Sequence, residues 1–232
     1  MQPKSAMVFA AGFGTRMRHL TNDMPKPLVP VLGKPMIDHT LDILSNAGIA
    51  DVFVNTHYFA DPLEQHLKTK ISITTIREEP EILETGGGLK NALPQIGTDP
   101  VFTMNCDSIW LDGNPIEQLL QSWNPDTMDG LLLILKKPNA QGYLGAGDFL
   151  LTDQARLQRK GTAKEAPYVY SGVQIIKTEG LNAITEQCFS INVLWEKMIA
   201  EGRLSGAIYD GTWVDVGYPE GIELAEKIAA DV

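Results

Sequence analysis

Hydrophobic and polar positions follow two periods along the first half of the chain. Short runs rich in apolar and β-branched residues have the composition of buried β-strands, at residues 6–11, 51–57, 71–79, 100–107 and 130–137. Apolar residues recur at helical spacing in the segments between them, at residues 35–47, 61–67, 85–93 and 114–123. This alternation predicts an α/β fold: a doubly wound, mostly parallel, Rossmann-like mixed sheet with helices on both faces.

The second half of the chain follows a looser pattern. It predicts strands at residues 147–152, 168–176 and 211–217, and helices at residues 193–201 and 219–230. In the first half, Asp61 before Pro62 has the position of a helix N-cap. No linker, internal repeat or low-complexity tract divides the sequence, so we expect a single domain over residues 1–232.

The segment FAAGFGTRMRHLTNDMPKPLVPVLGKPM, residues 9–36, departs from both periods. It contains one acid, Asp23, and four basic residues, which are Arg16, Arg18, Lys26 and Lys34. The loop after the first strand of a doubly wound sheet lies at the edge where ligands bind, and loops longer than about 12–15 residues are usually functional. Its glycines let backbone N–H groups approach a phosphate closely. We therefore expect an anion site here; the alternative is a surface loop that tolerates glycine.

Charge and cysteine content narrow the function classes. The 232 residues include 19 basic and 29 acidic side chains, so the net charge is 19 − 29 = −10, which argues against a broad nucleic-acid interface. Cys106 and Cys188 lack metal-ligand spacing and are too few for a disulfide framework, as expected in a reducing compartment. No run approaches the ~18 apolar residues of a membrane span. We expect a cytoplasmic protein without membrane or nucleic-acid partners; the oligomeric state stays open.

Known nucleotide-binding motifs fit the loop poorly. The Walker pattern G-x-x-x-x-G-K-[ST] is absent. The dinucleotide fingerprint G-x-G-x-x-G would need a glycine where Met17 stands, which disfavours an NAD-dependent dehydrogenase. Pro25 and Pro27 restrict the backbone on both sides of Lys26, and this rigidity suits a lysine that contacts a phosphate.

Two aspartates are candidate metal ligands. Asp107 ends the fourth predicted strand, which neighbours the first strand in a doubly wound sheet, so its carboxylate would face the glycine loop. Mg²⁺ prefers one or two carboxylates together with phosphate oxygens and waters. A turn or helix-capping role is the alternative for Asp107. Strand alternation leaves Asp215, in TWVDVG, either paired, bound to a metal or on a solvent-facing side.

The motif AAGFGTRM followed by PKPLVPVLGKPM resembles the signature of the sugar-1-phosphate nucleotidylyltransferases. The resemblance continues through VNTHY, ETGGGLKNAL, NCD and TWVDVG, and so covers nearly the whole chain. The short chain and the segments LETGGG, GDFLL and VYSGV are most similar to N-acetylmuramate-1-phosphate uridylyltransferases, with mannose-1-phosphate guanylyltransferases and glucose-1-phosphate thymidylyltransferases as near relatives. The resemblance implies a nucleotide-binding half at residues 1–136 and a sugar-binding half at residues 137–232.

The same resemblance implies a role for individual residues. Arg16 and Lys26 would be catalytic, and Asp107 and Asp215 would hold Mg²⁺. Contacts to the nucleoside triphosphate and the sugar 1-phosphate would come from Ala11, Gly12, Gly14, Thr15, Glu84, Gly86, Gly87, Asn105, Asp148, Ser171 and Gly172.

Two questions stay open at this level. The Glu-Lys-Pro element of the family is missing before strand 168–176, where the chain has RKGTAKEAPYVY, so a role for Lys160, Lys164 or Glu165 is undecided. A non-catalytic nucleotide-sugar sensor on the same fold would be expected to lack one of the two basic residues or one of the two acids. All four are present, which favours an enzyme.

Overall fold

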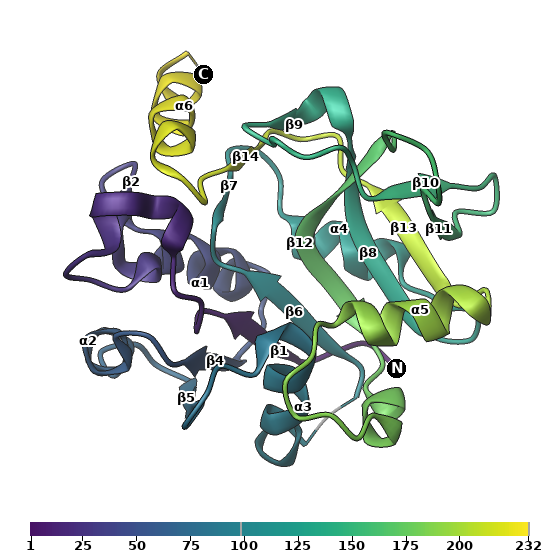
Figure 1. Cartoon of the computed structure of the whole chain (residues 1–232), viewed down its shortest axis with the longest axis horizontal. Coiled ribbons are helices and arrows are strands. Elements are labelled where there is room, and N and C mark those ends of the chain that lie inside the picture. Colours follow the sequence, from purple (N-terminus) through teal and green to yellow (C-terminus); the bar gives the residue numbers. More distant parts are fainter. Residues whose placement is uncertain (98, 232) are drawn as a thin grey trace.

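A nine-stranded mixed sheet forms the centre of the computed structural model, which describes residues 1–97 and 99–231 (Figure 1). Its strands are β1 (Ser5–Phe9), β4 (Asp51–Thr56), β5 (Ile73–Arg77), β6 (Val101–Asn105), β8 (Gly130–Lys136), β10 (Phe149–Leu151), β11 (Leu157–Arg159), β12 (Tyr168–Ile176) and β13 (Leu204–Ile208). Strands β6, β1, β4 and β5 are consecutive and parallel, and β12 joins β6 in the antiparallel direction. The predicted α/β fold is confirmed, and β1 and β6 are neighbours as expected.

Strand β13 was not predicted from the sequence. It pairs in parallel with β8 and has the sequence LSGAI. Small residues weaken the hydrophobic signal of such a segment. A Cβ at Gly206 would lie 2.8 Å from Leu157 Cδ2 and 2.9 Å from Ile134 Cδ1, so these side-chain ends pack closely over the glycine. Its parallel pairing extends the sheet beyond β8.

Two small sheets lie beside the central one. The first consists of β7 (Ser108–Trp110), β14 (Trp213–Asp215) and β9 (Ala140–Gln141), and the second of β2 (Pro30–Val31) and β3 (Lys34–Pro35). Strand β7 follows β6 almost directly, and its antiparallel pairing with β14 brings the C-terminal part of the chain to the end of β6. This pairing joins residues of the two predicted halves of the chain, 1–136 and 137–232.

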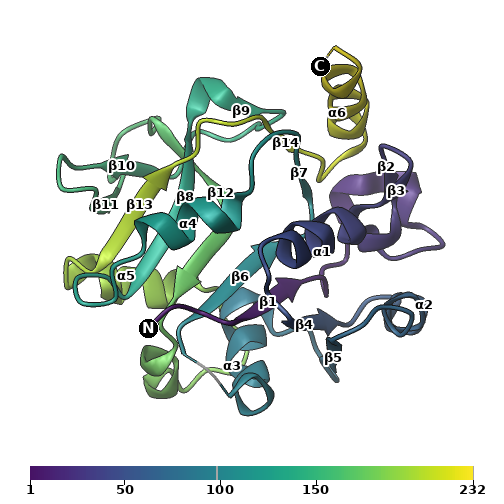
Figure 2. The same cartoon turned by 180° about the vertical axis from the view of Figure 1, so that it is seen from behind.

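Helices cover both faces of the central sheet, as the alternating pattern predicts. The helices on the central sheet are α1 (Met36–Asn46), α2 (Ala60–Leu67), α3 (Glu84–Ile96), α4 (Pro115–Ser122) and α5 (Asn192–Ala200). Helix α6 (Pro219–Ala230) packs instead beside β14 and β2, and the 3-10 turns are η1 (Thr15–Thr21), η2 (Lys26–Leu28), η3 (Lys137–Asn139) and η4 (Glu179–Ala183). Helices α3 and α5 lie in front of the sheet in Figure 1, and α1 and α4 lie in front in the reverse view of Figure 2. No helix among the described residues is long and apolar enough to cross a membrane.

The predicted N-cap of α2 is wrong. The N-cap is Phe59, two residues earlier than predicted and in the left-handed conformation (φ 49°), and the helix begins at Ala60. Asp61 lies inside the first turn and forms a salt bridge with Arg77 instead. The negative charge near the helix N-terminus is still favourable for the helix dipole.

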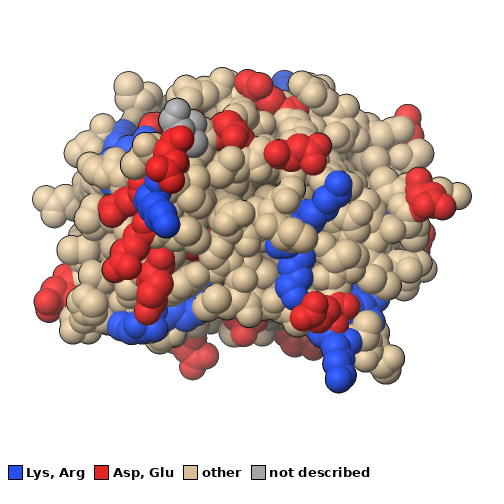
Figure 3. All heavy atoms as spheres, turned by 90° about the horizontal axis from the view of Figure 1, so that it is seen from above, with Lys and Arg blue, Asp and Glu red and all other residues tan. Residues whose placement is uncertain are grey.

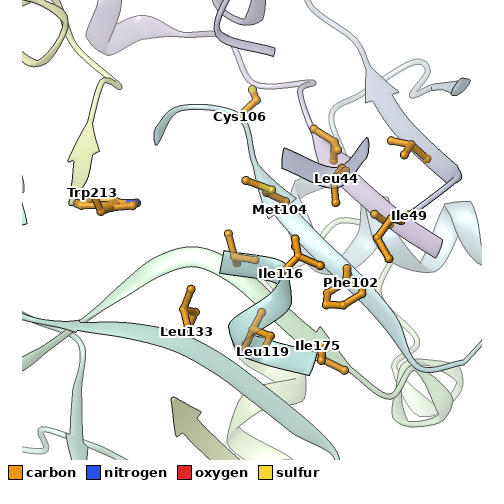
Figure 4. Close-up of a cluster of buried hydrophobic side chains, with 14 of the residues drawn as sticks. Leu44, Ile49, Phe102, Met104, Cys106, Ile116, Leu119, Leu133, Ile175 and Trp213 are labelled. Carbon is orange, nitrogen blue, oxygen red and sulfur yellow. The ribbon is translucent and has the colours of Figure 1, made fainter. Parts of the chain in front are cut away.

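Successive residues of β1 pack on opposite sides of the sheet. Ala6 and Val8 belong to a buried cluster with side chains of α1 and α4, while Met7 packs with side chains of α3 and α5. Figure 4 shows the first cluster, with Leu44 and Ile116 among its members. A continuous apolar strand therefore reflects burial on both faces.

Candidate active site

Four charged side chains meet at the carboxyl end of β6. Lys26 Nζ donates to Asp107 Oδ2 at 2.6 Å, and Arg16 Nη2 lies 3.4 Å from the same oxygen. Arg16 Nη1 lies 3.7 Å from Asp215 Oδ2. The Lys26 side chain is 13% exposed and the Arg16 side chain is 60% exposed, so the lysine is fixed and the arginine is open to solvent. The structure thus brings together the two basic residues and two acids that the sequence analysis singled out.

The pairing of β7 with β14 places the two aspartates. Asp215 is opposite Ser108, the residue after Asp107, and the Val216 N–H donates to the Asp107 carbonyl at 3.0 Å. The side chain of Asp215 is 15% exposed, and Val214 is completely buried. Of the alternatives for Asp215, the solvent-facing side is excluded.

Charge and burial shift the pKa values of Asp107 and Asp215 in opposite directions. Burial by itself raises the pKa of Asp107, but the charge and hydrogen bond of Lys26, together with Arg16, outweigh it and hold this pKa below its ordinary value. Burial and the negative charge of Asp107 raise the pKa of Asp215, although the Gly217 N–H and Arg16 act against this rise. The two acids therefore repel each other across the site.

This carboxylate pair fits a divalent cation that keeps other ligands. Among the described residues, no group of three or more His, Cys, Asp and Glu side chains could hold a metal ion by itself. Mg²⁺ is commonly bound by only one or two carboxylates, with phosphate oxygens and waters completing its shell. The repulsion that raises the pKa of Asp215 is what such a cation would relieve.

The basic loop has structure of its own, which its sequence did not predict. Residues 15–21 form η1 and residues 26–28 form η2, and Met17 is fully buried against Val214 and Val216. Apolar residues at isolated positions of a loop leave no periodic signal, so only the packing reveals this order. Thr15 stays exposed at the start of η1, next to Arg16.

Gly14 connects this loop to Lys26. It has a φ of +66°, and a Cβ at this position would lie 2.8 Å from Lys26 Cβ and 3.1 Å from Thr21 Cγ2. Its carbonyl accepts from Met17 N at 2.8 Å and from Thr21 Oγ1 at 3.2 Å. The second glycine of the motif is therefore needed both for a left-handed turn and for the close approach of the lysine.

A first pocket opens beside this cluster. Its lining includes Ala11, Gly12, Lys26, Glu84 and Asp107. Nothing described lies within 4 Å of a Cβ added at Gly12, so its backbone faces open space. The pocket thus has exposed backbone next to two fixed charges, as a phosphate chain requires.

A buried polar brace holds both walls of the first pocket, and the sequence analysis missed it. Asn55 Oδ1 accepts from Ala10 N at 2.7 Å, and Asn55 Nδ2 donates to Glu78 Oε1 at 2.8 Å. The other oxygen of Glu78 accepts from Leu83 N at 2.8 Å. The only available signal was a polar residue in the apolar strand DVFVNT. The brace ties the end of β1 to the start of α3.

Gly86 and Gly87 have a packing reason to be small. Their N–H groups both donate to the Phe189 carbonyl, at 2.9 and 3.0 Å. A Cβ would lie 2.5 Å from the Phe189 ring at Gly86, and 2.1 Å from the Gln187 carbonyl oxygen at Gly87. The substrate contact that the resemblance implies for the two glycines stays a prediction. Glu84, with a φ of 58°, does line the first pocket.

A second pocket adjoins the first and shares Asn105 with it. Asp148, Arg159, Tyr170 and Trp195 line this second pocket. Asp148 Oδ2 accepts from Tyr170 N at 2.8 Å, and its other oxygen accepts from the Tyr143 hydroxyl at 3.4 Å. The shared lining residue shows that the pocket beside the charged cluster and the pocket of Arg159 are adjacent.

Ser171 and Gly172 do not line either pocket, although they belong to β12 beside them. The Ser171 hydroxyl donates to the Leu133 carbonyl at 2.7 Å, and the residue is 1% exposed. Gly172, with a φ of +90°, lies at an irregularity of the β12–β8 pairing, where a Cβ would lie 3.1 Å from Asn105 Cβ. Gly172 thus allows Asn105 its position.

The segment that stands in place of the Glu-Lys-Pro element also lies apart from both pockets. Lys160 Nζ donates to the Lys164 carbonyl at 3.2 Å, and Glu165 forms a salt bridge of 3.0 Å with Lys137. The residue of this region that lines the second pocket is Arg159, which precedes Lys160 and ends β11.

Comparisons with known proteins identify the family of the chain. The model of the MobA-like NTP transferase domain matches residues 6–159. The chain is 41% identical to the N-acetylmuramate alpha-1-phosphate uridylyltransferase of Caulobacter vibrioides, over 99% of this chain and 98% of that protein. It is 29% identical to the mannose-1-phosphate guanyltransferase beta-A of Xenopus laevis and spans 61% of that protein's length.

Two solved structures share the fold. The inositol-1-phosphate CTP transferase from T. maritima has a TM-score of 0.80 at 17% identity, covering 99% of this chain and 98% of that one. HddC from Yersinia pseudotuberculosis, complexed with GMP-PN, has a TM-score of 0.78 at 20% identity, covering 97% and 99%. The chain therefore belongs to the family of MobA-like NTP transferase domains and, within it, to the sugar-1-phosphate nucleotidyltransferases.

Proposed function

We propose that this protein transfers a uridylyl group from UTP to N-acetylmuramate 1-phosphate, giving UDP-N-acetylmuramate and pyrophosphate. The observation that carries the proposal is the cluster of Lys26, Arg16, Asp107 and Asp215. Lys26 and Asp107 of this cluster line the first pocket. The choice of substrates is supported by the 41% identity to the Caulobacter vibrioides uridylyltransferase over almost the whole of both chains.

The reaction needs positioning and charge stabilisation more than proton transfer. A phosphate oxygen of the sugar 1-phosphate attacks the α-phosphorus of UTP, and the bond to the bridging oxygen of pyrophosphate breaks. The attacking oxygen is already anionic, so a general base is not required. Lys26, held rigidly between Pro25 and Pro27, would stabilise the charge on the α-phosphate.

Arg16 and the glycine loop would hold the leaving part of the nucleotide. Arg16 is the more exposed of the two basic residues, so its guanidinium can exchange an aspartate for phosphate oxygens. The backbone at Ala11 and Gly12, with Gly14 and Thr15 behind it, would contact the β- and γ-phosphates. This division leaves Lys26 next to the reacting phosphorus.

Asp107 and Asp215 are the residues that would hold Mg²⁺. When bound there, the ion supplies positive charge between two anionic reactants, which otherwise repel each other. Both carboxylates already lie in contact with Arg16, so they share one site.

We place the protein in the cytoplasm, where nucleoside triphosphates are available.

The second pocket would take the sugar. It adjoins the first through Asn105, so a sugar there can keep its phosphate near Asp107. Aromatic side chains of Tyr170 and Trp195 offer the flat apolar surface that sugar rings pack against. Asp148, for which the resemblance implies a substrate contact, lines this pocket.

Pyrophosphate release tests the proposal. The purified protein is incubated with Mg²⁺, each nucleoside triphosphate in turn, and the 1-phosphates of N-acetylmuramate, mannose and glucose. We expect the fastest release with UTP and N-acetylmuramate 1-phosphate. A preference for GTP with mannose 1-phosphate, as in the Xenopus laevis relative, or for dTTP with glucose 1-phosphate would replace the proposed substrates.

One variant and one measurement on the wild type separate this enzyme from a sensor. Asp107→Asn should abolish metal-dependent release, and full activity in that variant would remove Asp107 from the site. Nucleotide binding by the wild-type protein without release from any pair would indicate the non-catalytic alternative.

A further inference from the structure

Arg159 brings a positive charge into the second pocket of an acidic protein. It ends β11, opposite Phe149 of β10, and its side chain lines the pocket together with Asp148 and Asn192. The side chain is 31% exposed. Nothing in the transfer reaction described above requires a guanidinium at this position.

Two hydrogen bonds and two aromatic rings fix the guanidinium of Arg159. Its Nε donates to Glu196 Oε1 at 2.7 Å, and its Nη2 donates to Asn192 Oδ1 at 2.6 Å. These partners are four residues apart and so lie on one face of α5. The guanidinium carbon is 4.7 Å from the centre of the Phe149 ring and 5.6 Å from that of Trp195. The group is thus preorganised, with little rotamer entropy left to lose.

One donor of this guanidinium stays available. Among the hydrogen bonds of the described residues, Nη1 of Arg159 has no partner. The acid that lines the same pocket, Asp148, already accepts bonds from Tyr170 and Tyr143. Glu196 is on the outer side and does not line the pocket. An anionic ligand group is therefore the natural partner for the free edge of Arg159.

That group cannot be the phosphate that reacts. Lys26 and Asp107 line the first pocket and Arg159 lines the second, with Asn105 in the wall between them. When the phosphate of the sugar lies at the charged cluster, the group that reaches Arg159 must be a substituent on the sugar ring. N-acetylmuramate has such a substituent, because its lactyl ether ends in a carboxylate.

We infer that Arg159 is the specificity residue that selects a carboxylate-bearing sugar 1-phosphate over the neutral sugar of the same ring. This inference rests on the proposed function, since it assigns the sugar to the second pocket. A charge-assisted hydrogen bond in a partly buried site is strong enough to separate two such sugars.

The test compares two sugars that differ only in the lactyl ether, N-acetylmuramate 1-phosphate and N-acetylglucosamine 1-phosphate. Pyrophosphate release with UTP gives kcat/KM for each sugar in the wild type and in Arg159→Gln. We expect Arg159→Gln to lower kcat/KM for N-acetylmuramate 1-phosphate roughly 10- to 100-fold, mainly through KM, because one charged hydrogen bond is lost. For N-acetylglucosamine 1-phosphate, kcat/KM should fall less than about threefold. The KM for UTP should not change.

Two further variants guard against a purely structural effect. Arg159→Lys keeps the charge and should recover part of the preference. Lys160→Gln removes the same charge from a neighbouring side chain outside both pockets, and should keep the wild-type ratio.

The outcomes separate this inference from the proposed function. Wild-type release with both sugars at similar kcat/KM, or an equal loss for both sugars in Arg159→Gln, would overturn the role of Arg159 and leave the transferase in place. Absence of release with every pair of the panel would overturn the proposed function, and the inference with it.

Discussion

Replacement of Gly14 by alanine tests how the loop holds its lysine. In the structure, Gly14 has a φ of +66°, and an added Cβ would lie 2.8 Å from Lys26 Cβ. The neighbour is the root of the lysine side chain, which Pro25 and Pro27 restrain, so it cannot simply swing away. The alanine must therefore strain its own backbone and also displace Lys26.

The magnitude of this effect has two parts. A left-handed conformation costs a non-glycine residue roughly 1–2 kcal/mol, and overpacking typically costs a further 1–3 kcal/mol. We expect Gly14→Ala to lower the free energy of unfolding by about 3 kcal/mol, or roughly 6–12 °C in melting temperature for a chain of this size. A displacement of Lys26 by about 1 Å should also lower kcat on the order of 100-fold.

Gly12→Ala is the matched control for stability. A Cβ at Gly12 would have nothing described within 4 Å, and its φ lies outside the left-handed region. Thermal unfolding followed by circular dichroism should therefore give a melting temperature close to that of the wild type for this variant. Equal melting of Gly14→Ala and the wild type, to within about 1 °C, would refute the strain argument.

Other predictions concern charge. Arg16→Ala should lower kcat by roughly 100- to 1000-fold but change stability by less than about 1 kcal/mol, because the side chain is 60% exposed. Lys26→Ala should reduce activity similarly and also destabilise by roughly 1–3 kcal/mol, since it leaves Asp107 without its closest partner; unchanged melting would contradict this.

Hydrogen bonds from Arg203 and Lys177 outweigh partial burial and lower the pKa of Asp129 to about 2.

The pH dependence of Asp129 follows from the sign of this shift. The folded pKa lies below the unfolded one, so the stabilising contribution is complete above about pH 5 and is lost as the pH falls towards about 2. Urea unfolding should show the wild type roughly 2 kcal/mol more stable than Asp129→Asn at neutral pH, with a gap that closes in acid. A gap that is constant with pH would show that packing, not charge, is responsible.

The surface agrees with the charge balance of the sequence. On the face seen in Figure 3, basic and acidic side chains are interspersed, without a continuous basic area. The four basic residues of the loop are largely paired with acids: Arg16 and Lys26 with the aspartates of the site, Arg18 with Glu220, and Lys34 with Asp42. The loop is therefore basic without making the surface basic.

Much of this protein was determined by local sequence pattern. The alternation of apolar runs and helical spacing predicted the α/β fold, because burial on two faces leaves a signal in consecutive residues. The glycine motif, Lys26 between two prolines, and Asp107 at a strand end each carry their chemistry within a few residues. The local context of Lys26 and Asp107 could therefore nominate these two residues, while the catalytic role of Arg16 and the metal-binding role of Asp215 are implied by the family resemblance.

The tertiary structure decided everything that depends on contacts between distant residues. Strand alternation left Asp215 undecided, and only the pairing of β14 with β7 places it beside Asp107. The hydrogen bond between Asn55 and Glu78 joins residues 23 positions apart, and the hydrogen bonds of Arg159 to Glu196 and Asn192 join residues more than 30 positions apart. A side chain's partners across such separations leave no periodicity in the sequence, because they are fixed by the packing of whole elements.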